Sequence, residues 1–197
     1  MKKVSLSGSL RENVGKKDAK KERRNGNVPC VLYGGKEQVH FSVVAFDFGK
    51  IVFTPETFLV ELNIDGKVHQ ALLQDVQYHP VSDSALHADF LEVVEGKTIV
   101  SALPVKVVGN SPGVIAGGKL QQKIRKLKVK GLIENLPEEI KVDISTLKIG
   151  DSIKVKAVQP ENIQLLDTPN SVVVMVKAGR GAAVVAAEDE AVAEAAE

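Results

Sequence analysis

Residues 58–78 read FLVELNIDGKVHQALLQDVQY and predict the architecture of the chain more clearly than any other segment. Two apolar and β-branched runs, 58–64 and 68–78, flank the dipeptide Asp65-Gly66. Both of these residues tolerate the positive φ that a type I′ turn requires, so the segment predicts a β-hairpin. Because similar runs separated by turn residues recur along the rest of the chain, we expect a mainly β protein.

The same patterns predict elements on either side of this hairpin. They are a second hairpin over 28–33 and 39–43, a helix over 43–53 and a strand over 86–94. Pro55 would end the helix, because proline cannot continue one. On the strand, the period of two places His87 and Asp89 on the same face.

The strand pattern pauses at residues 94–97 and then starts again, which predicts a domain boundary. We expect one domain over 1–94, a second domain over 95–179 and an acidic, alanine-rich tail over 180–197. Strands of the second domain are predicted at 103–108, 124–133, 139–144, 152–157 and 171–177, a spacing typical of a barrel or a sandwich. After Arg180 the tail carries five acids and no base, so we expect it to be disordered or weakly helical in patches. Its charge would limit nonspecific binding to nucleic acid or would only keep the protein in solution.

A cationic segment interrupts the β pattern near the start of the chain. Between Arg11 and Arg24 there are seven Lys or Arg and three acids, a net charge of +4 in a chain whose total is +1. Gly15 and Asn25-Gly26 would bound a short helix here. Its cations share one stripe and almost no apolar face accompanies them, so like charges repel until a polyanion binds. The alternative is that these charges only form the solvent-exposed face of a helix and bind nothing.

Composition excludes several classes of protein. With 197 residues and 44% hydrophobic residues the chain is globular, with one large or two small domains. Aromatic residues are few and tryptophan is absent, which argues against a large platform for stacking bases. Cys30 is the only cysteine, so no internal disulfide can form, and we expect a small core residue in a reducing compartment. We find no membrane span or secretory leader, and therefore expect a cytoplasmic protein.

Motifs for catalysis, cofactors and metals fail on inspection. Residues 113–119 reproduce the glycine and lysine spacing of a P-loop, but Leu120 stands where Ser or Thr must bind magnesium. The four histidines are scattered without the ligand spacing of zinc sites. His87 and Asp89 lack a nucleophile beside them and are interpreted as hydrogen-bonding groups. We therefore expect no catalytic residues, no metal, no cofactor and no enzymatic activity.

Three ordered stretches of the chain resemble one protein family. They are Arg11-x-x-x-Gly15-Lys16 with Arg23-Arg24-x-Gly26-x-Val28-Pro29 and Tyr33-Gly34; Gln74-Asp75-Val76-Gln77-Tyr78-His79-Pro80 with His87-Ala88-Asp89-Phe90; and Gly113-Val114-x-Ala116-Gly117-Gly118-x-Leu120 with Ile149-Gly150-Asp151-Ser152. Over about residues 3–178, the chain resembles the two-domain bacterial large-subunit ribosomal protein that binds 5S rRNA, also called the general stress protein CTC family.

The resemblance implies an amino-terminal six-stranded β-barrel with small helices that binds loop E of 5S rRNA, followed by a mostly β domain. It implies a structural, non-catalytic component of the large ribosomal subunit, which we expect to be a monomer when free. The RNA-contacting positions carried over are Arg11, Arg24, Tyr33, His87 and Asp89, with Lys16, Lys20 and Arg23 as neighbouring backbone contacts.

The chemistry of these residues agrees with RNA recognition. Arginine can donate two hydrogen bonds to a phosphate or a base edge. Asp89 would repel phosphate, so we expect a donor on a base to satisfy it. Ring packing of Tyr33 on the barrel and a purely local bond between His87 and Asp89 are the structural alternatives.

The chain departs from the family pattern in its basic segment. Lys17-Asp18 stands where the family usually has a small pair, and Lys20 and Lys21 stand where arginine is common. Lysine contacts phosphate as a point charge, so these two positions would bind less specifically.

The second domain carries a further basic row, at Lys119, Lys123, Arg125, Lys126, Lys128 and Lys130. Lys126, Lys128 and Lys130 would share one side of a strand, with Leu127 and Val129 packed inward. The row would contact ribosomal RNA or a neighbouring ribosomal protein, or would only protect a solvated strand edge. A stress-related adaptor that binds proteins off the ribosome is the alternative function.

Overall fold

A computed structural model describes residues 2–35, 37–94, 96–158, 160 and 163–179 of the chain. Contacts divide it into two compact units. Unit 1 comprises Met1–Ala102 and Lys130–Glu138, and unit 2 comprises Leu103–Val129 and Glu139–Glu197. The domain boundary after residue 94 stays a prediction.

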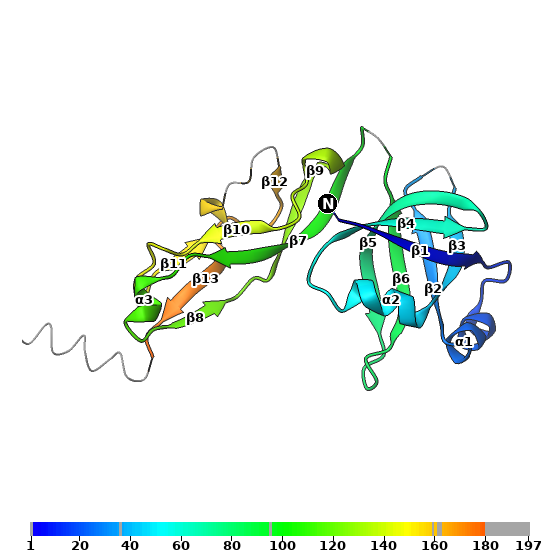
Figure 1. The fold of residues 1–197 in the computed structure, drawn as a ribbon, viewed down its shortest axis with the longest axis horizontal. Helices are drawn as coiled ribbons and strands as arrows, with labels where there is room; N and C mark the ends of the chain where they lie inside the picture. Colours follow the sequence, from blue (N-terminus) through cyan, green and yellow to red (C-terminus); the bar gives the residue numbers. More distant parts are fainter. Residues whose placement is uncertain (1, 36, 95, 159, 161–162, 180–197) are drawn as a thin grey trace, which may run out of the picture. The chain divides into compact units, whose positions relative to one another are not determined.

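Unit 1 is built around a closed barrel of six strands (Figure 1). They are β1 (Lys2–Leu10), β2 (Asn27–Tyr33), β3 (Val39–Val44), β4 (Phe58–Ile64), β5 (Lys67–Tyr78) and β6 (Ala85–Glu92). Their order is β1-β3-β2-β6-β5-β4, and β1 pairs in parallel with β4 to close the ring. Closure satisfies the backbone groups that an open sheet leaves at its edges. The predicted six-stranded barrel is confirmed.

Apolar residues at alternate strand positions fill the interior of the barrel. On β4 these are Val60, Leu62 and Ile64, all buried. The helix α2 (Ala45–Val52), confirmed where the sequence predicts one, adds Phe48 and Ile51 to the same core. Each such side chain contributes about 1.5–3 kcal/mol when it leaves water, so this core supplies much of the stability of the barrel.

The predicted hairpin between β4 and β5 is confirmed, together with its turn. Asp65 has φ of 48° and Gly66 has φ of 84°, as a type I′ turn requires, and Ile64 pairs with Lys67 across the turn. Leu59 and Leu72 are paired across the two strands and pack with a residue of β7, Ile99. β4 therefore buries apolar residues on both of its faces.

The elements that follow form two sheets and three short helical segments. One sheet has the order β10-β7-β9-β12 and the other has the order β11-β13-β8. The strands are β7 (Thr98–Val108), β8 (Lys119–Gln122), β9 (Lys126–Leu132), β10 (Ile140–Asp143), β11 (Ser152–Lys154), β12 (Gln164–Leu165) and β13 (Val172–Lys177). The helical segments are α3 (Pro112–Ile115) and the 3-10 turns Ile133–Asn135 and Val155–Ala157.

The five predicted strands coincide with β7, β9, β10, β11 and β13, but the predicted ranges include neither β8 nor α3, and one predicted strand is too long. The segment 152–157 ends as a strand at Lys154, because Val155–Ala157 form a 3-10 turn. β12 was not predicted, since two residues are too few to show an alternation. The expected disorder of the tail concerns residues 180–197, which lie outside the described part of the chain. No helix in the described part is long and apolar enough to cross a membrane.

Candidate nucleic-acid interface

The helix α1 (Lys16–Arg24) sorts its charged residues by face, as predicted from its sequence. Its cations are all exposed: Lys16, Lys17, Lys20, Lys21, Arg23 and Arg24. Asp18 and Glu22 are half-buried beside Ala19. Asn25 ends the helix, and Gly26 follows with φ of 82°, the left-handed residue that the sequence predicts. α1 is therefore a short helix whose solvent-exposed face is cationic.

Three side-chain contacts fix α1 against the barrel. Arg11, which follows β1, donates from Nε and Nη2 to Oδ2 of Asp18 at 3.1 and 2.6 Å. Asn27 of β2 donates from Nδ2 to Oε2 of Glu22 at 2.9 Å. Arg23 donates from Nε to the backbone oxygen of Leu86 in β6 at 2.9 Å. Because the acids of α1 serve as these anchors, its outer cations are left without acidic partners on the helix itself.

Arg11 differs from the other cations of this region. Its side chain is only 8% exposed, and Asp18 holds its guanidinium. The structure therefore separates Arg11 from the exposed cationic face and gives it a part in positioning α1. A direct contact between Arg11 and RNA stays a prediction.

A polar face on the outside of the barrel adjoins the end of α1. Nδ1 of His87 and Oδ1 of Asp89 lie 2.8 Å apart on β6, both side chains about one-third exposed. Their predicted common face is confirmed. Since Arg23 bonds to Leu86, the residue before His87, the structure brings the cationic helix next to this face.

Two further residues, Tyr33 and Asp75, belong to this polar face. Asp75 of β5 lies opposite Asp89 in the sheet, and both carboxylates act on Tyr33 of β2. Burial first, and then these two negative charges, raise the pKa of Tyr33 above its ordinary value. Its hydroxyl therefore stays protonated and can donate a hydrogen bond. Asp75 was not chosen from the sequence, because its pairing with Asp89 depends on a register shift after Leu73.

Residues 113–119, which have the glycine and lysine spacing of a P-loop, have a structural role. The amide of Gly113 donates to Leu147 O at 3.0 Å, and the amide of Gly118 donates to Gly113 O at 2.8 Å. These donors are occupied and cannot bind phosphate. A Cβ on Gly113 would lie 2.6 Å from the backbone carbon of Lys148, so this glycine allows two backbone segments to approach. In the described residues, no cluster of His, Cys, Asp or Glu could hold a metal ion.

The basic row of residues 119–130 is divided between the two later sheets. Lys119 begins β8, whereas Lys126, Lys128 and Lys130 point outward from β9. Leu127 and Val129 are completely buried, as predicted. β9 pairs with β7 on one side and with the two-residue strand β12 on the other, so it is covered on both sides only beside β12.

The barrel and its helix define a class of protein, a mainly β protein whose closed six-stranded barrel carries a short, exposed cationic helix. Models of known families match in the same order along the chain: the Ribosomal L25p family over residues 6–90 and the Ribosomal protein TL5, C-terminal domain, over residues 98–180. The chain belongs to the bL25 family of large ribosomal subunit proteins.

Relatives along nearly the whole chain support this membership. Large ribosomal subunit protein bL25 of Phocaeicola vulgatus is 43% identical over 196 residues, covering 94% of this chain and 99% of the relative. The protein of the same name from Porphyromonas gingivalis is 43% identical over 189 residues, covering 93% and 98%. That of Amoebophilus asiaticus is 40% identical over 190 residues, covering 96% and 97%. The chain is thus a ribosomal protein and not an enzyme.

Proposed function

We propose that the chain is a structural component of the large ribosomal subunit that binds 5S rRNA at loop E. One observation supports this proposal above all. The hydrogen bond from Arg23 of α1 to Leu86 of β6 holds the cationic helix beside the polar face of the barrel. The helix supplies phosphate contacts, and the β face supplies hydrogen-bonding groups for base edges. The protein would act on the ribosome, in the cytoplasm.

The eight proposed contact residues fall into two groups by chemistry. Phosphate contacts are assigned to the exposed cations Lys16, Lys20 and Arg23, and the remaining contacts to Arg11, Arg24, Tyr33, His87 and Asp89. The shortest contact of the Asp89 carboxylate is from Oδ1 to Nδ1 of His87, and its other oxygen, Oδ2, is assigned to accept from an amino group of a base. A noncanonical internal loop exposes such groups more than a regular A-form helix does.

The second domain is proposed to contact neighbouring components of the subunit. Its outward lysines on β9 fit either RNA or an acidic protein surface. No observation on the described residues favours the alternative of an adaptor that acts off the ribosome.

The test is a titration of the full chain with 5S rRNA at near-physiological salt. The control is an RNA of the same length in which loop E is converted to Watson-Crick pairs. We expect tight binding to 5S rRNA and binding to the control that is weaker by at least about tenfold, since a regular helix hides its base edges. Equal or negligible binding of both RNAs would refute the proposal.

Salt dependence and one substitution sharpen this test. The exposed Lys17 and Lys21 raise the phosphate contacts of α1 to at least five, and with about five to seven such contacts log K should fall by roughly four to six per unit of log salt. Asp89→Ala should reduce affinity for 5S rRNA by about 1–3 kcal/mol and leave the control RNA unaffected. An equal loss of affinity for both RNAs would show that Asp89 does not recognise the base sequence or the loop structure.

A further inference from the structure

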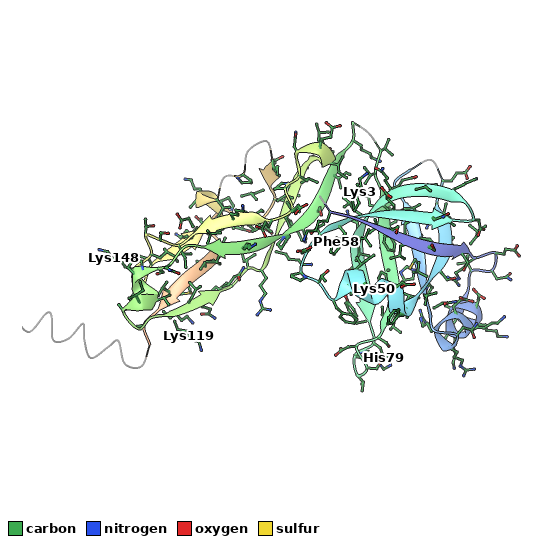
Figure 2. All side chains as sticks on the ribbon, in the orientation of Figure 1. Lys3, Lys50, Phe58, His79, Lys119 and Lys148 are labelled. Carbon is green, nitrogen blue, oxygen red and sulfur yellow. The ribbon has the colours of Figure 1, made fainter. Side chains whose placement is uncertain are left out.

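A cavity of about 250 Å³ lies at the end of the barrel unit where α1 and α2 meet β6. Its apolar lining includes Val28 and Phe48, both of the barrel core, and Val52 of α2. Residues of α1, α2, β2, β5 and β6 all contribute to its walls. In Figure 2, Lys50 of α2 and His79, which follows β5, mark two of the elements that border it.

Two aromatic residues at this cavity are unusually open to solvent. Phe53 is 78% exposed and Tyr78 is 45% exposed, and both line the cavity. Phe53 lies against Gly49, where an added Cβ would be 3.3 Å from Cε2 of the ring. Because glycine leaves this side free, the ring can rest on the helix while most of its surface stays uncovered.

The polar groups at the cavity favour an anionic, hydrogen-bonding occupant. Arg23 lines it and also belongs to the outward cationic face of α1. Its Nε is held by Leu86 O, so the guanidinium has a fixed position. Burial and the charge of Asp75 raise the pKa of Tyr78, which keeps its hydroxyl a donor. No acidic residue is among the described residues that line the cavity.

We propose that this cavity receives one unstacked base of the bound RNA, with Phe53 and Tyr78 as stacking groups and Arg23 on the adjoining phosphate. This inference rests on the proposed function and adds a contact to it. Base stacking on an aromatic ring tolerates any sequence because every base has a π face. The cavity is smaller than the roughly 300–1,000 Å³ of sites for drug-sized ligands, which suits a single base. Its continuity with α1 through Arg23 favours RNA over a protein segment.

The absence of tryptophan from the chain allows a direct test. Phe53→Trp places the only tryptophan of the variant at the cavity, where its fluorescence can be excited apart from that of the two tyrosines. A base that stacks on it should quench the fluorescence when 5S rRNA is added. The matched control is Phe46→Trp, because Phe46 is equally exposed at 77% but does not line the cavity. Quenching confined to position 53 is the expected result, and equal responses at the two positions would overturn the proposal.

Affinity measurements separate this inference from the proposed function. We expect Phe53→Ala to weaken binding to 5S rRNA at least about fivefold and Phe46→Ala to leave it unchanged. Both substitutions replace exposed rings, so neither should disturb folding, which thermal unfolding would verify. If the unmodified protein binds 5S rRNA and Phe53→Ala binds it equally well, only the cavity proposal fails. If the unmodified protein does not bind, the proposed function fails as well.

Discussion

Asp18 of α1 holds the helix against the barrel through its ion pair with Arg11. It accepts two of the three hydrogen bonds of the Arg11 guanidinium, whose side chain is 8% exposed, and the third goes to the backbone oxygen of Asn13. A desolvated cation is costly unless it is paired, so this contact matters more than a pair on an open surface would. The partner of Asp18 could not be predicted from the sequence, because on a helix drawn alone it simply points away from the cationic stripe.

Removing this carboxylate should therefore destabilise the fold. We expect Asp18→Ala to lower the free energy of unfolding by about 1–3 kcal/mol, because it leaves the Arg11 charge unpaired at a half-buried site. Urea denaturation would measure the loss. Glu12→Ala is the matched control, since Glu12 is an exposed acid of the same segment. Equal stability of the two variants would contradict this role of Asp18.

Because of Cys30, the free energy of unfolding of the barrel should depend on pH in the alkaline range. Burial raises the pKa of its thiol from 9.0 to about 12. Between these values the unfolded chain loses the thiol proton and the native chain keeps it, so the free energy of unfolding falls as pH rises above 9. The contribution is at most about 1.4 kcal/mol per pH unit.

The variant Cys30→Ala isolates this titration. Denaturation of both proteins at pH 8, 9 and 10 should show a shallower decline of stability above pH 9 in the variant, even though the cavity left by the missing sulfur lowers its stability throughout. Parallel declines in the two proteins would show that the thiol is not the titrating group.

Elements with a strong local signal were predicted with their type and approximate bounds. Asp65-Gly66 imposes a turn by its backbone preference, and the cations of α1 exclude a buried strand. The tethers of α1 and the position of Asp75 beside Asp89 depend on strand pairings between distant segments, which no local pattern contains. The exposure of the α1 cations and the common face of His87 and Asp89 were thus predictable from local patterns, whereas the contacts that bring the helix and this face together were not.

The helix α1 should act on RNA mainly through charge. Lys20 is exposed on it and binds as a point charge, so Lys20→Ala should reduce the slope of log K against log salt by about 0.7–0.9, equally for any RNA. Titrations of 5S rRNA and of the loop E control at several salt concentrations would show this. Lys67→Ala, an exposed lysine at the start of β5, should leave the slope unchanged. A similar change of the slope in both variants would mean that α1 contributes no more to the electrostatic binding of RNA than any other exposed lysine does.

At the scale of the whole molecule, charge is distributed unevenly along a nearly neutral chain. The formal net charge is +1, although residues 11–24 alone carry +4. The balance comes largely from the five acids after Arg180: Glu188, Asp189, Glu190, Glu194 and Glu197. A cationic surface attracts every nucleic acid through its phosphates, so specificity requires that this general attraction be limited. We expect the acids that are covalently joined to the same chain to supply a repulsion of that kind.

Replacing these five acids by their amides should weaken the discrimination between RNAs. The change keeps the length of the tail and raises the formal net charge from +1 to +6. We expect affinity for the loop E control to rise more than affinity for 5S rRNA, because nonspecific binding is almost entirely electrostatic whereas specific binding also uses base contacts. The difference should shrink as salt is raised and the Debye length falls below about 8 Å. Unchanged affinities for both RNAs at low salt would show that the tail does not modulate binding and only adds charge for solubility.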